Sequence, residues 1–479
     1  MIFLSRLVEK RSCVIRQLAD TWEEEMGFWR FLGNPRFGWE SLRADCLEGI
    51  AEKVVGRHVL SIQDGSTISL NGYLNKRKGF GQTGTVGDHP GIELHPALIL
   101  DAQNGACLGL AALDFPESNS VGRPLKPTRA RKEAEAVTKK TGVWLRVGAA
   151  ARQRLKEAAL VTHIADRAAD FFEMFLEFGQ KKTENDHFIV RSNGDRHLGH
   201  RLPRGKSPYR GQPDLLVETG LGGTPIRLPH RALMSQLLQK LPARATCRLE
   251  LPATQKRKKR TALVEIRFTP KVSVCRPRNL YGRTFEGQLL PGSAQIAVVE
   301  VREITPDLPP GEEPICWRLL TSHTVTKVEE ALQIVAWYAC RWKIELFFAA
   351  AKSRGLDLEH ALIEHAPRLK KLAVLVAMAT VQVIQLLQAR DGNSEQLISD
   401  VFSAEEADLI AKINPKLEGK TDLRKNPHQA DSLAFATWVI ARLGGWKGYK
   451  THRPPGIGTI SRGLIRFFQI KNATAFFDD

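Results

Sequence analysis

Two aspartates, Asp64 and Asp166, each stand where a short apolar run ends. Asp64 closes the run that begins at His58, and Asp166 closes the run that begins at Leu160. Apolar runs of this length, bounded by turn signals, indicate buried strands. In an α/β layer, ligands and catalytic groups gather at the carboxyl ends of strands, where two neighbouring carboxylates would suit Mg²⁺. The ordinary alternative for each is an aspartate that caps a turn or a helix.

A second polar group falls on one side of a helix that we predict from Val328 past Lys352. At about 100° per residue its members lie within about 60° of one another; they are Tyr338, Arg341, Glu345 and Lys352. Arginine and lysine can hold phosphate, tyrosine can hydrogen-bond it, and glutamate can complete a metal site. The alternative is an exposed helical face with an ordinary i,i+4 Arg–Glu pair.

The 479 residues carry 70 Lys and Arg against 52 Asp and Glu, a formal net charge of +18. Residues 119–157 hold 11 basic and three acidic residues, and residues 251–283 hold ten and one, so the two segments supply 17 of the 18 excess charges. Residues 1–50 hold seven basic and eight acidic residues. Two concentrated basic segments favour a long anionic ligand such as DNA or RNA, and a solvated basic face is the alternative for either.

The composition excludes several classes of protein. With 43% hydrophobic and 25% charged residues, the chain is neither disordered nor collagen-like. Its seven cysteines form no Cys-x-x-Cys pair, which argues against zinc fingers and a secreted disulfide framework. The apolar stretch Leu372 to Leu387 is interrupted by threonine and glutamine and predicts a buried helix rather than a membrane span. The first residues lack a signal peptide's apolar block, so we expect a reducing cytoplasm.

The pattern along the chain predicts an α/β core. Residues 193–310 are rich in Gly, Pro and short β-like pieces, which favours a β-rich insertion rather than part of the central layer. A mostly helical tail follows residue 390, with breaks at Gly444-Gly445 and Pro454-Pro455. Further strands are expected at Leu94–Leu100, demoted or shortened by Pro96, and at Ala106–Leu113 and His187–Arg191, and helices are expected over residues 1–55, 132–158 and 168–178.

The spacing Tyr338-x2-Arg341-x3-Glu345-x6-Lys352 resembles the signature of bacterial insertion-sequence DDE transposases, the hairpin-forming cut-and-paste group. The resemblance runs from about residue 28 to about residue 450. Other segments similar to that family are Gln63–Thr67, Ala165–Asp170, with its Asp-Arg-x-x-Asp motif, Phe188–Ser192, Pro314–Thr321 and Val439–Gly445.

The resemblance implies a ribonuclease-H-like catalytic core with a β-rich insertion and a helical C-terminal domain. The expected domains are a partial N-terminal helical DNA-binding region over residues 1–55, the first part of the core over 56–192, the insertion over 193–312, the second part of the core over 313–389, and a dimerisation region over 390–479.

The resemblance also assigns roles to residues. Asp64, Asp166 and Glu345 match the family's metal ligands, for two Mg²⁺ or Mn²⁺ ions. Tyr338, Arg341 and Lys352 match contacts to phosphates of the transposon end. Trp317 matches the residue on which a flipped base stacks, with ordinary strand core as the alternative, and Arg191 is a weaker match for a contact nearby.

The implied activity is metal-dependent cleavage, hairpin formation, hairpin opening and strand transfer, four in-line displacements at phosphorus that one carboxylate cluster can serve in turn. Flipping a base relieves the hairpin turn, and stacking offsets the cost of unstacking it. The expected partners are double-stranded DNA, as transposon end and as target, and a second copy of the chain in the synaptic complex. The expected location is the bacterial cytoplasm, at the nucleoid, with no membrane.

Some positions depart from the family. Relatives have a longer segment before the part that aligns with Phe31–Pro35, so we expect a shortened N-terminus. Ala168 stands where relatives often have an acid, and Phe348 and Ala349 replace polar or basic residues. These departures keep a second hypothesis open: a truncated or domesticated non-catalytic relative that binds DNA or inhibits an intact transposase. A stand-alone ribonuclease-H-like nuclease is a third.

Overall fold

The computed structural model describes residues 2–70, 78–82, 90–116, 139–180, 185–201, 214–219, 223–251, 257–352, 356–392, 395–448 and 453–478. Two parts of the predicted basic segments, residues 119–138 and 252–256, lie outside these described residues. The first part of the helix expected over 132–158 lies outside them too, and the described part of that helix is Lys139–Arg154.

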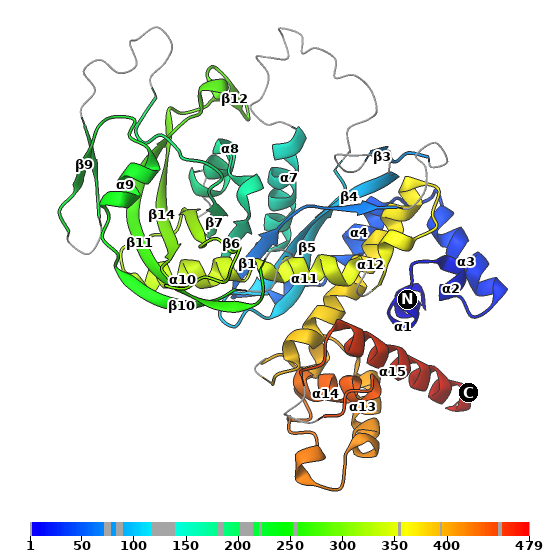
Figure 1. The fold of residues 1–479 in the computed structure, drawn as a ribbon. Helices are drawn as coiled ribbons and strands as arrows, with labels where there is room; N and C mark the ends of the chain where they lie inside the picture. Colours follow the sequence, from blue (N-terminus) through cyan, green and yellow to red (C-terminus); the bar gives the residue numbers. More distant parts are fainter. Residues whose placement is uncertain are drawn as a thin grey trace.

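Within the described residues, eleven strands form one sheet at the centre of the molecule (Figure 1). The order β5-β4-β1-β6-β7 has β1, β6 and β7 parallel, and β4 antiparallel to both β1 and β5. This mixed sheet is compatible with the expected ribonuclease-H-like core. The strands are β1 His58–Gln63, β2 Ser66–Ser69, β3 Gly81–Gln82, β4 Pro90–Asp101, β5 Cys107–Asp114, β6 Leu160–Ala165, β7 Asp186–Arg191, β8 Leu215–Val217, β9 Ile226–Leu228, β10 Ala245–Leu251, β11 Arg260–Cys275, β12 Thr284–Phe285, β13 Gln288–Leu289, β14 Ser293–Glu303 and β15 Cys316–Thr321.

Helices cover both faces of the sheet, which is why the central strands are buried at nearly every position. Successive side chains of β1 point to opposite faces: Leu60 and Ile62 pack in the core cluster that contains α12, and Val59 packs in the cluster that contains α7. The helices are α1 Ile2–Lys10, α2 Ile15–Leu18, α3 Trp22–Gly33, α4 Trp39–Cys46, α5 Ile50–Lys53, α7 Lys139–Arg154, α8 Phe172–Phe175, α9 Met234–Lys240, α10 Val328–Ala339, α11 Trp342–Ala351, α12 Ala366–Ala389, α13 Ala404–Leu417, α14 Leu433–Leu443 and α15 Ile457–Asp478.

The β-rich segment after β7 does not stand apart from the central layer, and that expectation was wrong. Strands β10, β11 and β14 continue the same hydrogen-bonded sheet, because β14 pairs with β15 and β15 pairs with β7. β14 has the burial of a central strand, with Ala297 to Val301 all buried. The chain therefore returns to the core through β14 and β15, inside the sheet and next to β7, and α10 follows in contact with β14 and β11 (Figure 1).

Strand β4 is longer than the sequence predicts, and Pro96 lies inside it. On one side of β4, Gln63 pairs with Ala97 and Ser66 pairs with Leu94, so Pro96 faces the break between β1 and β2. On the other side the register with β5 shifts next to Ala97. Proline is tolerated here because the ladder is interrupted where its missing N–H would have bonded.

The longest helix, α12, is the buried core helix that its composition predicts. It is the one described helix long and apolar enough to cross a membrane by length and composition, and 83% of its most apolar window is buried in the protein. The N-terminal helices α1 and α4 and the C-terminal helices α14 and α15 pack against it. The breaks expected at Gly444-Gly445 and at Pro454-Pro455 are confirmed as helix boundaries.

His95 of β4 makes stability sensitive to acid. Its side chain is 1% exposed, its ring lies edge-on to Trp144 at 4.5 Å between centroids, and burial lowers its pKa to about 4, with Asp114 opposing that shift. Because this value lies below that of an unfolded histidine, the unfolded chain takes up the proton first, and stability is lost as pH falls from about 6.5 towards 4.

Replacing His95 with phenylalanine removes this titration and keeps a ring against Trp144. Between pH 7.5 and 5.5, the free energy of unfolding of His95→Phe should fall by about 1 kcal/mol less than that of the wild type. Urea unfolding at the two pH values measures the difference. The exposed His200→Phe is the control, and an equal drop in all three proteins would contradict the prediction.

Candidate active site

Asp64 and Asp166 lie at the same edge of the sheet. Each directly follows its strand, and β1 and β6 are parallel neighbours with Ile62 paired to Ile164. Asp64 Oδ1 accepts a hydrogen bond from the Gly65 N–H at 2.8 Å, and Asp166 Oδ1 accepts one from the Ala168 N–H at 2.8 Å. Each aspartate therefore does cap the turn that follows it, as the ordinary alternative expects. This hydrogen bond uses one oxygen of the carboxylate and fixes the orientation of the side chain.

Glu345 reaches the same edge from α11, but not along one continuous helix as predicted. The helix is interrupted at Cys340 and Arg341, where α10 ends and α11 begins. Arg341 stands at that junction and is 9% exposed. Its Nη1 donates to Asp64 Oδ2 at 3.1 Å and to Glu345 Oε1 at 3.4 Å. The interruption turns the guanidinium in towards the strand ends.

These groups perturb one another electrostatically. Burial, and next the charge of Asp166, raise the pKa of Asp64 to about 7, whereas Arg341 acts to lower it and Glu345 acts weakly to raise it. The pKa of Arg341 is raised: burial acts to lower it, and the charges of Tyr338, Asp64, Glu345 and Asp166 outweigh that effect. A buried carboxylate whose pKa is raised by a neighbouring carboxylate is the arrangement expected where a cation is to be bound.

The donor set fits a hard divalent cation. Carboxylate oxygens on two strand ends and a facing helix are the ligands that Mg²⁺ and Mn²⁺ prefer. Glu345 is half exposed, which leaves the site open to solvent and substrate. As the side chains stand, however, no group of three His, Cys, Asp or Glu among the described residues is close enough to hold an ion. Arg341 occupies the space between two of the carboxylates instead.

Tyr338 and Trp317 form a buried aromatic pair beside the carboxylates. Their ring centroids are 5.2 Å apart at 68°, and their exposed fractions are 3% and 4%. Burial raises the pKa of the Tyr338 phenol, and the charges of Arg341 and Arg191 oppose that shift. Arg191 ends β7, and its Nη2 donates to the Cys316 carbonyl at 3.2 Å. Trp317 is thus buried as an ordinary strand-core residue would be, and neither face of its ring is open to a base.

Lys352 is the one member of the predicted stripe that the structure does not bring to the carboxylates. It ends α11, and its Nζ lies 3.7 Å from Glu359 Oε1 in an ion pair. Tyr338, Arg341 and Glu345 do gather at the strand ends with Asp64 and Asp166. The stripe is therefore divided where α11 ends, just before Lys352, and not at the interruption between α10 and α11.

Asp170 holds the site in place, a role that the sequence did not assign. One of its oxygens accepts from the Asn193 N–H at 2.6 Å, and the other accepts from Arg196 Nε at 2.9 Å. These bonds fasten the turn after Asp166 to the beginning of the insertion. The signal was present in the sequence, because Asp170 completes the Asp-Arg-x-x-Asp motif, but its partners lie more than 20 residues further on.

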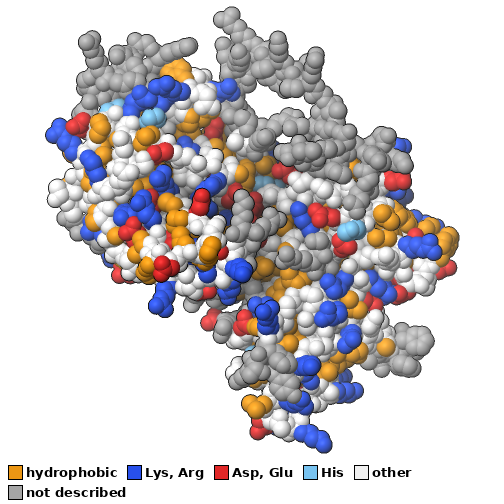
Figure 2. Space-filling model, viewed as in Figure 1, with side chains coloured by type: hydrophobic (Ala, Val, Ile, Leu, Met, Phe, Trp, Pro, Cys, Tyr) orange, Lys and Arg blue, Asp and Glu red, His pale blue; other side chains and the backbone are white. Residues whose placement is uncertain are grey.

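Part of the second basic segment is neutralised within the protein. Arg260 pairs with Glu303 and, at 2.7 Å, with Glu312, and Arg267 lies 3.5 Å from Glu300. These arginines hold β11 to its neighbours and are not free for DNA. Elsewhere on the face in Figure 2, Lys and Arg side chains occur over both the insertion strands and the C-terminal helices.

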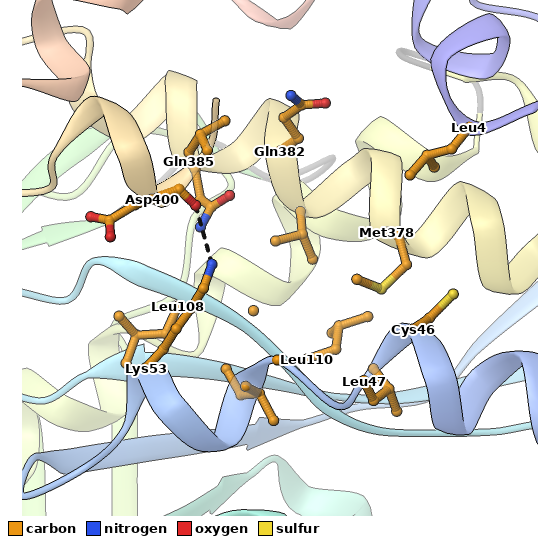
Figure 3. Close-up of a pocket in the computed structure, with 15 residues that line it drawn as sticks. Leu4, Cys46, Leu47, Lys53, Leu108, Leu110, Met378, Gln382, Gln385 and Asp400 are labelled. Carbon is orange, nitrogen blue, oxygen red and sulfur yellow. Dashed lines mark hydrogen bonds between the residues drawn. The ribbon is translucent and has the colours of Figure 1, made fainter. Parts of the chain in front are cut away.

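A cavity of about 270 Å³ lies between the N-terminal helices, β5 and α12. Figure 3 shows Lys53 reaching across it to the Asp400 carbonyl, a bond of 3.1 Å, with Met378, Leu110 and Leu47 along the apolar wall. None of the predicted site residues lines this cavity. The carboxylate cluster therefore remains the candidate active site.

Residues 192–382 match a family model described as a transposase DDE domain. The matched range contains Trp317, Tyr338, Arg341, Glu345 and Lys352, and it begins after Asp64, Asp166 and Arg191. The match supports a DDE transposase family and indicates a transposase, an enzyme class that acts on DNA.

Proposed function

We propose, from the premise of a transposase domain over residues 192–382, that this chain cleaves and joins DNA at transposon ends in a metal-dependent reaction. Asp64, Asp166 and Glu345 are its catalytic carboxylates. The observation that carries the proposal is that Arg341 bonds both Asp64 and Glu345 while the charge of Asp166 acts on Asp64, although β1, β6 and α11 are distant in sequence.

The three acids would hold two Mg²⁺ or Mn²⁺ ions at the end of β1 and β6. A bound divalent ion supplies Lewis-acid stabilisation of charge at the reacting phosphate. Asp64 and Asp166 are already oriented by the main-chain N–H groups of Gly65 and Ala168, so little side-chain freedom remains to be lost. The Gly65 and Ala168 bonds use one oxygen of each aspartate; the second oxygen of Asp64 accepts from Arg341 and would pass to the ion when Arg341 moves.

Arg341 is the residue that we propose to hold the phosphate, whereas Tyr338 is 3% exposed and buried in the free protein. In the free protein Arg341 balances the charge of Asp64 and Glu345, and its fork of N–H donors suits a phosphate equally well. We infer that Arg341 moves from the carboxylates to the DNA backbone when the acids take up cations. Hairpin formation and strand transfer at the same cluster, and action as a dimer, are the finer parts of this proposal.

A non-catalytic relative is the alternative, and two observations favour it. Lys352 is engaged with Glu359, and both Trp317 and Tyr338 are buried, so three residues assigned to DNA are not presented to it. Such a protein would bind transposon-end DNA and leave it uncut. A stand-alone nuclease would cut without preference for a terminal repeat.

Cleavage of a labelled duplex that carries the inverted repeat flanking the gene tests the proposal. With Mg²⁺ or Mn²⁺ we expect a nick at the repeat boundary and then a hairpin, both resolved on a denaturing gel. A chelator should abolish both products. Binding without any nick would favour the non-catalytic relative, and equal cutting of a duplex with a scrambled repeat would favour the stand-alone nuclease.

A further inference from the structure

A second cavity, of about 550 Å³, lies between the connection from α3 to α4 and the beginning of α12. Three of its lining residues are cations, Arg368, Lys370 and Lys371, and Glu40 is the one acid in that lining. No ion pair joins any of these three cations to an acid within the part of the chain that the structure describes. No ion pair among the described residues therefore neutralises their charge.

The cations are held in place by uncharged neighbours. Lys371 is 4% exposed, its Nζ donates to the Asn34 carbonyl at 2.7 Å, and it lies 4.1 Å from the centre of the Phe37 ring. The Lys370 ammonium lies 5.4 Å from the centre of the Trp39 ring. Ring faces attract cations. These contacts order the ammonium groups and leave their charge for a ligand.

Arg368 bridges the two walls of the cavity. Its guanidinium lies against Gly33, where a Cβ would come within 3.2 Å of Nη2. Burial acts with the charge of Arg368 to lower the pKa of Lys371, as expected for like charges held together. Such a group of cations favours an anion that can share its charge among them.

The end of α12 positions these side chains, but its own N–H groups are already used. Ala366 N–H donates to the Lys78 carbonyl at 3.0 Å, and the N–H groups of Arg368 and Leu369 donate to the His365 carbonyl at 3.1 Å. The aromatic rings are likewise covered by the lysines. The cavity therefore offers charged side chains to phosphate and offers no ring face to a base.

The cavity lies on the sheet edge that also carries the candidate active site. Strand β2 begins two residues after Asp64 and ends at Ser69, which pairs with Gly91 of β4. Gly81 of β3 pairs with Gly91 from the other side, and Gly79, just before β3, lines the cavity. The path from Asp64 to the cavity runs five residues to the end of β2, at about 3.3 Å each, and then crosses two strand spacings. The cavity therefore lies on the order of 20 Å from Asp64. That span equals about six base pairs of duplex.

We propose that this cavity binds the phosphodiester backbone of DNA about six base pairs from the bond that is cleaved. Arg368 and Lys370 supply the phosphate contacts, and Lys371 with its ring contact positions them. The inference rests on the proposed function, since it takes DNA at the carboxylates as given. It adds a contact made jointly by the N-terminal helices and α12, so that a duplex is held at two points.

The test compares two double variants. The first carries Arg368→Gln and Lys370→Gln. The second, the control, carries Lys412→Gln and Lys416→Gln and so loses two exposed charges from α13. Fluorescence anisotropy measures the binding of each protein to a fluorescein-labelled duplex of about 40 base pairs that carries the inverted repeat, from 50 to 200 mM KCl. Each lost phosphate contact lowers the slope of log affinity against log salt concentration by about 0.9. We expect the first pair to weaken binding about tenfold at the low-salt end and to lower the slope by one to two contacts. The control pair should change neither by as much.

Shortening the duplex locates the contact. When the DNA ends within about four base pairs of the cleavage point on both sides, the wild type and the Arg368–Lys370 variant should bind equally, because the cavity then has no backbone to hold. An equal loss on short and long duplexes would overturn the inference, as would an unchanged slope on the long one. Far-ultraviolet circular dichroism and urea unfolding confirm that the variant is folded.

Binding and cleavage separate this inference from the proposed function. If the wild type binds and nicks DNA but the variant is unchanged, the cavity proposal alone fails. If the length-dependent loss is found and no nick occurs with either metal, the cavity proposal stands and the catalytic one fails. A wild type that binds no duplex overturns both.

Discussion

Replacing Asp64 with asparagine is expected to abolish DNA nicking while DNA binding persists. The substitution keeps the side chain's size and its hydrogen bond from Gly65, and removes the negative charge that a divalent ion requires. Loss of groups that merely orient metal ligands costs about 10–100-fold, so loss of a ligand should exceed about a hundredfold. Asp166→Asn and Glu345→Gln should behave alike, and pairs should lose little more than single variants, because the three act as one unit.

The same variant separates catalysis from stability. The pKa of Asp64 is raised to about 7 in the folded protein, so its ionised form opposes folding increasingly as pH rises from about 4 to 7. At pH 8, Asp64→Asn should therefore unfold at the same urea concentration as the wild type or a higher one. A loss of nicking that came with a large loss of stability would indicate an unfolded protein rather than a missing ligand.

Two conservative changes serve as controls for the carboxylates. Glu329→Gln on α10 and Asp408→Asn on α13 remove exposed acids, and both should nick at the wild-type rate. Single-turnover nicking with Mg²⁺ and with Mn²⁺ is the measurement. If nicking persists in Asp166→Asn, the assignment of the catalytic carboxylates is wrong.

Truncating Trp317 to alanine is expected to destabilise the protein by about 3–5 kcal/mol, the usual range for a fully buried aromatic side chain. The side chain is 4% exposed and packs edge-on against Tyr338, so its removal leaves a cavity beside the carboxylates. Trp317→Phe should cost less because much of the space stays filled. The midpoint and slope of urea unfolding give the free energies.

The result also decides between the two roles considered for Trp317. The control is Trp22→Ala, since Trp22 is 68% exposed, and a change at such a surface site is worth about 0.5 kcal/mol or less. If Trp317→Ala is as stable as Trp22→Ala yet slows hairpin formation, the ring is not core and stacking on a base is favoured. If it is destabilised and Trp317→Phe still forms hairpins, the core role is sufficient.

Much of the candidate site follows from local patterns. Asp64 and Asp166 could be found because short apolar runs ending in a turn predict strands, and parallel strands bring their ends to one edge. Arg341 and Glu345 could be found because an i,i+4 spacing is a property of one helical turn, which survives even where the longer helix is interrupted. The buried helix α12 could be found because its apolar length is interrupted by polar residues. Each of these features depends on residues close in sequence.

What the tertiary structure alone decided depends on residues far apart. Pro96 lies within β4 because the neighbouring strand breaks opposite it, and the insertion joins the central sheet because β14 pairs with β15. Lys352 turns from the carboxylates to Glu359 because the helix ends there, and Trp317 is covered by Tyr338. The cations at the start of α12 form a cavity only through Asn34, Phe37 and Trp39, more than 300 residues earlier. Short-range spacing determines strands, turns and single helical turns, but the partners that bury, pair or expose a side chain are selected by packing of the whole chain.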